Sequence, residues 1–237
     1  MNQNVISSTT VKRLISDIKE ITKNSPSKDG IYYKHDEENM MFGYALIIGP
    51  EDTPYAYGNF LFKFQFPCDY PHSPPIVTYH TNDGVTRFNP NLYTNGKVCL
   101  SVLNTWKGEQ WTGCQTIRSI LYVLCSILNN KPLTNEPGIT ETHKDFHSYN
   151  KIIQYQTYDV AINKIISKEY LPDIFEIFYA EIIENFKKNY DKIKCSLLDK
   201  SSKDNEIISC GVYRLSIKTH YNKLKHSIDK HYITNNN

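Results

Sequence analysis

The residue whose type and setting most directly suggest chemistry is Cys99, which follows an Asn-Gly pair at residues 95–96. Such a pair between strand-forming residues is the strongest short-range signal for a tight hairpin turn. We therefore expect Cys99 just past a turn, in a segment too short and polar to bury well, where it acts as an exposed nucleophile. The alternative is a small buried hydrophobic residue, since free cysteine is among the most buried residue types.

The ionisation of a thiol limits what it can do. A cysteine with the usual pKa of about 8.5 is only a few per cent thiolate at neutral pH. No histidine is close to Cys99 in the sequence, so a protease-like Cys–His pair would have to form between distant segments. An unactivated thiol suits exchange with an already activated thioester and suits hydrolysis of a peptide bond poorly.

The composition is that of a balanced globular chain. Its 237 residues carry 27 Lys and Arg against 25 Asp and Glu, a net charge of +2, so we expect neither nucleic acid nor a membrane surface as a partner. The sequence has no secretory signal pattern at its start and no apolar run near the ~18 residues of a spanning helix. We expect the cytoplasm, or a nucleus reached passively. The six cysteines form no CxxC pair, which favours free thiols in a reducing compartment.

The first half of the chain predicts one helix followed by an antiparallel sheet. Apolar residues at helical spacing predict an amphipathic helix over 11–21, capped by a residue of 8–10 and ended before Pro26. Four strand signals follow, at residues 31–34, 40–48, 59–66 and 76–80. The third alternates phenylalanines with other residues, as expected for a strand with one buried face. The short connections favour an antiparallel meander.

The second half of the chain predicts helices. We expect Thr112 to cap a helix that extends to Leu128, and further helices over 149–166, 173–190 and 213–232. Residues 201–209 form a polar break, and we expect residues 234–237 to be disordered. The order of helix, sheet and helices indicates an α+β domain. The helices after Tyr149 are amphipathic, and they cover the sheet, pack on each other or bind a partner.

Four motifs occur in a fixed order around Cys99: FPCDYPHSPP from Phe66, NPN from Asn89, YTNGKVCL from Tyr93, and a tryptophan before the second predicted helix. Together they resemble the ubiquitin-conjugating (UBC) family over about residues 11–166. The sequence most resembles the larger members with a C-terminal extension, which also read NPN where most members read HPN. The resemblance implies a UBC-like fold with a four-stranded antiparallel sheet and flanking helices. It divides the chain into a core domain at 8–168 and a helical extension at 169–237.

The resemblance also implies a function. Cys99 is expected to accept ubiquitin or a ubiquitin-like protein as a thioester from an activating enzyme. The charged enzyme then transfers the modifier to lysine, directly or with a ubiquitin ligase. No cofactor is expected on this chain, because ATP is consumed upstream by the activating enzyme.

Two further residues match catalytic positions of the family. Asn91 is expected to donate a side-chain N–H to the oxyanion that forms when lysine attacks the thioester. The alternative for Asn91 is that it only ties the loop together through backbone bonds. Glu136, in Asn-Glu-Pro after the second helix, matches the carboxylate that orients and deprotonates the lysine, or it is a plain solvated glutamate. Asn89 replaces the family's histidine, which is held to be structural.

Other residues match or depart from the family's docking surfaces. Lys12 and Arg13 match the basic pair that docks the activating enzyme, although they also fit a solvated helix face. His72 and Gly113 stand where many members carry an apolar residue and a proline that contact RING-type ligases, so the standard ligase contacts are in doubt. The segment 104–110 is longer than in minimal members; it either gates Cys99 or is pinned in place by Trp106.

Three rival functions remain in view. A catalytically dead adaptor would lack the nucleophile, but Cys99 is present. A cysteine hydrolase would need a distant histidine such as His143 within hydrogen-bond reach of the thiol. An interaction module would depend mainly on the C-terminal helices. His143 and His147 stand four residues apart, a spacing that can bind metal on a helix, but no third ligand is evident, so we expect no metal site.

Overall fold

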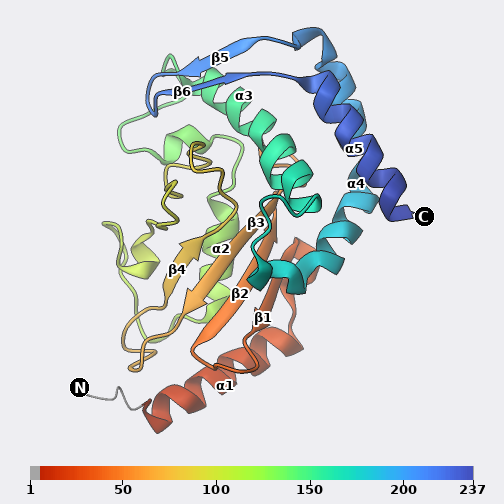
Figure 1. Cartoon of the computed structure of the whole chain (residues 1–237). Helices are drawn as coiled ribbons and strands as arrows, with labels where there is room; N and C mark the ends of the chain where they lie inside the picture. The colour runs from red at the N-terminus through yellow and green to blue at the C-terminus, as the bar shows by residue number, and fades with distance from the viewer. Residues whose placement is uncertain (1–5, 237) are drawn as a thin grey trace.

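The computed structural model describes residues 6–236 and contains a four-stranded antiparallel sheet. Its strands follow one another in the order of the sequence, with Ala45 opposite Phe62 and Leu46 opposite Leu61 in the central pair. The predicted meander and the α+β fold class are confirmed (Figure 1). The strands are β1 (Ile31–His35), β2 (Phe42–Ile48), β3 (Asn59–Gln65) and β4 (Ile76–Tyr79).

The inner face of the sheet carries the phenylalanines of β3 and packs against helices α1 (Ser8–Lys23) and α2 (Ile117–Ser126). The caps of both helices differ from the predicted ones. Ser7 caps α1, with its hydroxyl accepting from Thr10 N. Thr116, not Thr112, caps α2, because Thr116 and Ser119 exchange side-chain and backbone hydrogen bonds in a capping box. Residues 112–115 lie before the helix as irregular chain.

The outer face of the sheet is also buried where Leu46 and Leu61 lie side by side, both 0% exposed. The expectation of one buried face is therefore wrong at this end of β3. Phe175 and Phe178 belong to the same apolar cluster as the two leucines. The elements after α2 that supply this cover are α3 (Phe146–Gln156), a π-helical continuation (Thr157–Lys164), a 3-10 segment (Asp173–Phe178), α4 (Tyr179–Asp199) and α5 (Tyr221–Asn236).

The predicted polar break and last helix are partly wrong, because a second, two-stranded sheet lies within residues 201–218. Strands β5 (Ile207–Cys210) and β6 (Leu215–Lys218) pair in an antiparallel hairpin. Their alternating residues Ile208, Cys210 and Leu215 are buried in the main core cluster, which explains why this stretch is extended. The helix α5 continues to Asn236, so the expected disorder of residues 234–236 is also wrong; Asn237 lies outside the described residues.

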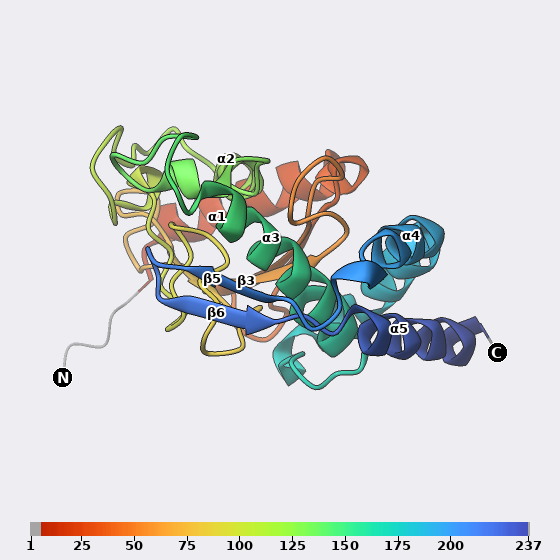
Figure 2. The same cartoon turned by 90° about the horizontal axis from the view of Figure 1, so that it is seen from above.

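The hairpin returns the chain from the extension to the core. In Figure 1, α4 and α5 flank one side of the molecule, while β5 and β6 cross above α3 towards the loops at the other side. The view from above in Figure 2 shows the same path. The C-terminal extension therefore contacts the core twice, through the helices at the sheet and through the hairpin turn near the loops. Short 3-10 helices complete the fold: Pro26–Asp29, Ser101–Leu103, Pro132–Asn135 and Ser201–Lys203.

Two expectations on the chain as a whole can be compared with the described part. Within residues 6–236, none of the helices combines the length and apolar content needed to cross a membrane. Five of the cysteines carry free thiols, as expected: Cys99, Cys114, Cys125, Cys195 and Cys210.

Candidate active site

Cys99 lies at the end of a tight turn, as the Asn-Gly pair predicts. Gly96 adopts φ +85°, a backbone conformation that residues with a side chain rarely adopt. The amide of Tyr93 donates to the carbonyl of Lys97 at 2.9 Å and closes the turn. The amide of Cys99 then donates to the carbonyl of Asn91 at 2.9 Å, so the turn brings the thiol residue beside the NPN motif.

The thiol itself is less exposed than expected. Cys99 is only 4% exposed, and its Sγ donates to the carbonyl of Thr105 at 2.9 Å. The cause is the segment 104–110, which is exposed and folds back beside the sulfur. Thr105 fixes this return, because its hydroxyl accepts from Leu100 N at 2.8 Å and donates to the carbonyl of Val98 at 2.9 Å. The expected exposure of Cys99 is thus wrong in this conformation, whereas its role as a nucleophile stays a prediction.

The sulfur is nevertheless not sealed in the core. Cys99 lines a small cavity of about 20 Å³ that also contains the three residues singled out beside it: Asn91, Trp106 and Glu136. Trp106 is 45% exposed, so it borders the cavity without being packed inside the protein. The remaining lining residues are Pro90, Tyr93, Asn135 and Pro137.

Asn91 points its side-chain amide at the backbone of Cys99. Its Nδ2 donates to the carbonyl of Cys99 at 2.7 Å, and its backbone N–H donates to Asn89 Oδ1 at 3.0 Å. The loop-tying role is therefore present in this conformation. Nδ2 carries a second N–H, and the oxyanion role of Asn91 stays a prediction.

Asn89, which replaces the histidine of the resembling family, has a complete set of hydrogen bonds. It is fully buried, and its Nδ2 donates to Tyr55 Oη at 2.9 Å and to the carbonyl of Ile127 at 2.8 Å. Its Oδ1 accepts from Asn91 N at 3.0 Å and from Asn135 Nδ2 at 3.3 Å. Two donors and two acceptors are thus all used. Asn89 joins the loop of Asn91 to the end of α2 and to the segment that carries Glu136.

Glu136 follows the short helix Pro132–Asn135, and it lines the Cys99 cavity. Its Oε2 accepts a hydrogen bond from the hydroxyl of Tyr213, in the turn between β5 and β6. Sequence reasoning missed Tyr213, which it placed at the start of a helix. Burial and then the Glu136 carboxylate raise the pKa of Tyr213 far above its usual 10, so the phenol stays protonated and donates.

The predicted docking pair on α1 is divided. Lys12 is exposed, whereas Arg13 is half-buried and bonded within the protein. Arg13 donates to Asp17 at 2.9 Å, to the carbonyl of Gly113 at 2.6 Å and to that of Gln115. These bonds attach α1 to the chain just before α2. The docking role of both residues stays a prediction.

The histidines considered for other chemistry lie elsewhere. His143 Nδ1 accepts from the amide of Asp145 at 3.2 Å, and His147 is exposed on α3. Among the described residues, the lining of the Cys99 cavity includes no histidine, so the Cys–His pair of a hydrolase is not formed there. The same part of the chain shows no cluster of three or more His, Cys, Asp or Glu side chains that could hold a metal.

Comparison with known proteins agrees with the motifs. A family model described as ubiquitin-conjugating enzyme matches residues 13–157. The chain is 40% identical over 185 residues to ubiquitin-conjugating enzyme E2 Z of Xenopus tropicalis, over 76% of this chain and 58% of that protein. It is 46% identical over 142 residues to the dual E2 ubiquitin-conjugating enzyme/E3 ubiquitin-protein ligase BIRC6 of Homo sapiens, over 56% and 3% of the two chains.

A third relative matches a larger share of this chain. The probable ubiquitin-conjugating enzyme E2 R521 of Acanthamoeba polyphaga mimivirus is 31% identical over 229 residues, over 83% of this chain and 16% of that protein. The chain spans little more than half the length of the E2 Z relative and far less of the other two.

Proposed function

We propose, because the chain belongs to the ubiquitin-conjugating enzyme family, that Cys99 carries ubiquitin or a ubiquitin-like protein as a thioester. The observation that supports this proposal is that Cys99, Asn91 and Glu136 all line one small cavity. These three groups are a nucleophile, a hydrogen-bond donor for an oxyanion and a proton acceptor.

Charging is a thiol exchange. The sulfur of Cys99 attacks the carbonyl carbon of the activating enzyme's thioester and gives up its proton to solvent. The new S–C bond forms, the old one breaks, and the activating enzyme's cysteine leaves as a thiolate. Because the bond that breaks is as activated as the bond that forms, the step needs no cofactor on this chain, and ATP is consumed upstream.

Discharge moves the modifier to an amine. The lysine nitrogen attacks the thioester carbon, charge develops on the carbonyl oxygen, and Asn91 Nδ2 donates an N–H to it. The lysine ammonium, with a pKa of about 10.4, must first lose a proton, and in this proposal Glu136 accepts it. The N–C bond forms, the C–S bond breaks, the nitrogen gives its second proton to solvent, and the Cys99 thiolate is released.

The partners follow from these two steps. An activating enzyme supplies the modifier, and exposed Lys12, with Arg13 beside it on α1, contributes to docking that enzyme. The modifier is transferred to the lysine substrate directly or with a ubiquitin ligase. The relative BIRC6 is described as both a conjugating enzyme and a ligase, which supports a connection between the two activities. We place the protein in the cytoplasm or the nucleus, where such partners act.

One experiment tests the proposal. The chain is incubated with activating enzyme, ATP and ubiquitin or a ubiquitin-like protein, and run on a non-reducing gel. We expect a thiol-sensitive band heavier by one modifier. Cys99→Ala should abolish the band, whereas Cys114→Ala, Cys125→Ala and Cys68→Ala should keep it. A band that survives Cys99→Ala, or no band with any modifier, would remove the proposal.

A further inference from the structure

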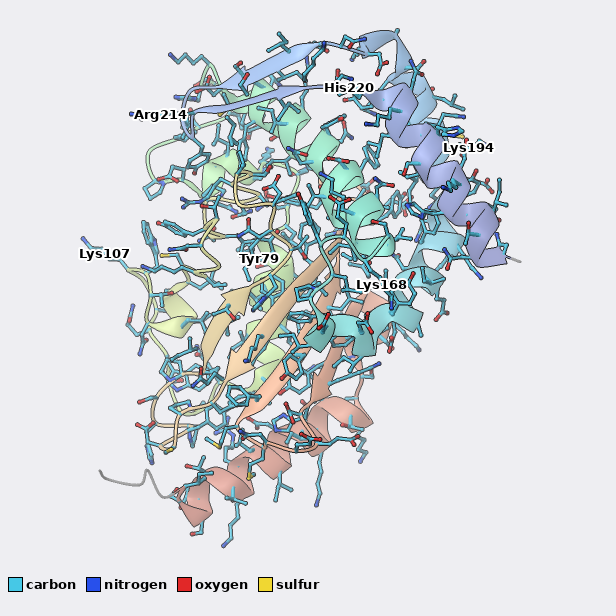
Figure 3. All side chains as sticks on the ribbon, in the orientation of Figure 1. Tyr79, Lys107, Lys168, Lys194, Arg214 and His220 are labelled. Atoms are coloured by element: carbon cyan, nitrogen blue, oxygen red, sulfur yellow. The ribbon has the colours of Figure 1, made fainter. Side chains whose placement is uncertain are left out.

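The turn between β5 and β6 reaches the candidate active site. Tyr213 in this turn donates its hydroxyl to Oε2 of Glu136, which lines the cavity of Cys99. Figure 3 labels Arg214, the next residue, at the tip of the hairpin, and Lys107 of the segment 104–110 at the same side of the molecule. The extension thereby supplies a hydrogen-bond donor to a residue of the core.

The turn is fixed independently of Glu136. The amide of Val212 donates to Asp145 Oδ2 at 3.0 Å, and Asp145 is buried at the start of α3. Gly211 approaches the same carboxylate so closely that a Cβ there would lie 3.2 Å from Oδ2. The ring of Tyr213 also packs against Tyr149 of α3, with ring centroids 5.6 Å apart. The hydroxyl therefore extends from a turn anchored on the core, not from a loose tip.

The ring of Tyr213 also contacts the loop that carries Asn91. The guanidinium of Arg87 lies 5.1 Å from the Tyr213 ring and 3.4 Å from the Tyr93 ring. Arg87 donates through Nε to the carbonyl of Asn89 at 3.2 Å and through Nη2 to that of Pro90 at 2.5 Å. Tyr213 thus contacts both sides of the cavity: its ring lies against Arg87, and its hydroxyl donates to Glu136.

A donor at this place has a definite consequence for the carboxylate. Glutamate has three rotatable side-chain bonds, and fixing them at the rim of the cavity removes freedom that lysine attack would otherwise have to remove. Tyr213 bonds Oε2, and the carboxylate has a second oxygen, Oε1. A phenol that stays protonated serves this purpose at any pH at which the enzyme works.

We propose that Tyr213 is a positioning residue for discharge to lysine: its hydroxyl holds Glu136 at the rim of the Cys99 cavity so that Oε1 meets the incoming ammonium. This inference rests on the proposed function. Oε1 of Glu136 takes one proton from the lysine ammonium and passes it to solvent. The neutral amine then forms the N–C bond, the C–S bond to Cys99 breaks, and the nitrogen gives its second proton to solvent. Charging of Cys99 involves no lysine and does not need Tyr213.

The test compares Tyr213→Phe with Tyr190→Phe in the full-length protein. Tyr213→Phe keeps the ring against Tyr149 and Arg87 and removes only the hydroxyl. Tyr190→Phe is the matched control, because it removes a hydroxyl that donates to Asp229 at 2.7 Å within the extension. Each variant is charged, purified from the activating enzyme and ATP, and mixed with free lysine at increasing concentrations.

We expect Tyr213→Phe to charge at the wild-type rate and to lower the maximal discharge rate on the order of ten-fold, the effect of a lost hydrogen bond to a charged group. Tyr190→Phe should discharge like the wild type. In a Glu136→Gln background, Tyr213→Phe should cause no further loss, because the hydroxyl acts through that carboxylate.

Three results would overturn the inference. Discharge of Tyr213→Phe at the wild-type rate would show that the hydroxyl does no positioning. An equal additional loss in the Glu136→Gln background would show that it acts elsewhere. Equal slowing of charging and discharge together with a lower melting temperature would assign Tyr213 a purely structural role. In all three cases Cys99 still becomes charged and the proposed function stands; failure of the wild type to charge would remove both.

Discussion

The thiol side and the carboxylate side of the Cys99 cavity are fixed by different parts of the chain. On the thiol side, Asn91 bonds Cys99 and Asn89 bonds Tyr55, all within the core. On the carboxylate side, Glu136 is bonded by Tyr213, 77 residues further along. The comparison teaches that the proposed nucleophile is held by hydrogen bonds within the core, which the extension reaches through Arg87, whereas the proposed proton acceptor is bonded directly by the extension.

The two faces of the sheet differ in the same way. The inner face is covered by α1 and α2, which flank the sheet in the sequence. The outer face at Leu46 and Leu61 is covered by residues of the extension, among them Phe175. The apolar packing of the core is thus continuous across residue 168, where the sequence divides the chain. We expect the core and the extension to unfold together.

The largest effect should come from removing this cover. Phe175 is fully buried, with its ring 5.8 Å from that of Tyr44 and 5.0 Å from that of His80. Phe175→Ala should lower the free energy of unfolding by about 3–5 kcal/mol, the usual cost of deleting a buried phenylalanine. Urea denaturation measures it. Ile177→Ala, whose side chain is 44% exposed in the same segment, is the control and should change stability by no more than about 0.5 kcal/mol.

The same denaturation experiment also tests whether the core and the extension unfold as one unit. The two tryptophans, Trp106 and Trp111, both belong to the predicted core domain, residues 8–168. The helices α4 and α5 of the extension contribute much of the helical circular dichroism. If core and extension are one unit, fluorescence and circular dichroism should give coincident transitions in the wild type and in Phe175→Ala. Separate transitions would mean that the extension is an independent module.

A smaller effect is expected on the thiol side. Asn91→Ala should still allow charging but should slow discharge to lysine by about 10²–10³-fold, the usual cost of losing one oxyanion donor. Asn39→Ala, in an exposed loop between β1 and β2, is the matched control. Single-turnover discharge measures the effect. Because Asn91 also bonds the carbonyl of Cys99, equal losses in charging and discharge would leave it only the loop-tying role.

Local patterns predicted the parts of the fold that depend on neighbouring residues. The alternation from Phe60 to Phe66 predicted β3 and its inner face, and the Asn-Gly pair predicted the turn before Cys99. The family motifs singled out Asn91 and Glu136, and both residues line the cavity of Cys99. In each case the signal comes from residues close in sequence or from the resemblance to a family.

The missed features depend on contacts between distant segments. Tyr213 and Ile217 stand four residues apart and continue the spacing of Tyr221 and Leu224, so the pattern predicted one helix where the structure has a strand and then a helix. The alternation of Ile208 and Cys210 before Gly211, a hairpin pattern, was the signal that could have found it. The burial of Cys99 is a nearer contact, with Thr105 six residues along the chain; the segment 104–110 was singled out, but its length did not predict that it folds back onto the sulfur.

The smallest effect is expected in the segment 104–110, which controls how far the thiol of Cys99 is exposed. Trp106 borders the cavity of Cys99 while the backbone of Thr105 accepts the thiol's hydrogen bond. Trp106→Ala should widen the approach to the sulfur and raise the rate at which a bulky maleimide alkylates Cys99 several-fold. Peptide mapping of the alkylated protein distinguishes Cys99 from the exposed Cys114 and Cys195.

The control for this loop is Lys107→Ala, an exposed neighbour that does not line the cavity. It should react like the wild type. If Trp106→Ala also leaves the rate unchanged, the indole only pins the loop, and the Thr105 carbonyl alone limits access to the sulfur. If instead the rate falls, the loop has collapsed onto the cavity, and Trp106 props it open. A rise confined to Trp106→Ala assigns the segment 104–110 a gating role on the thiol side.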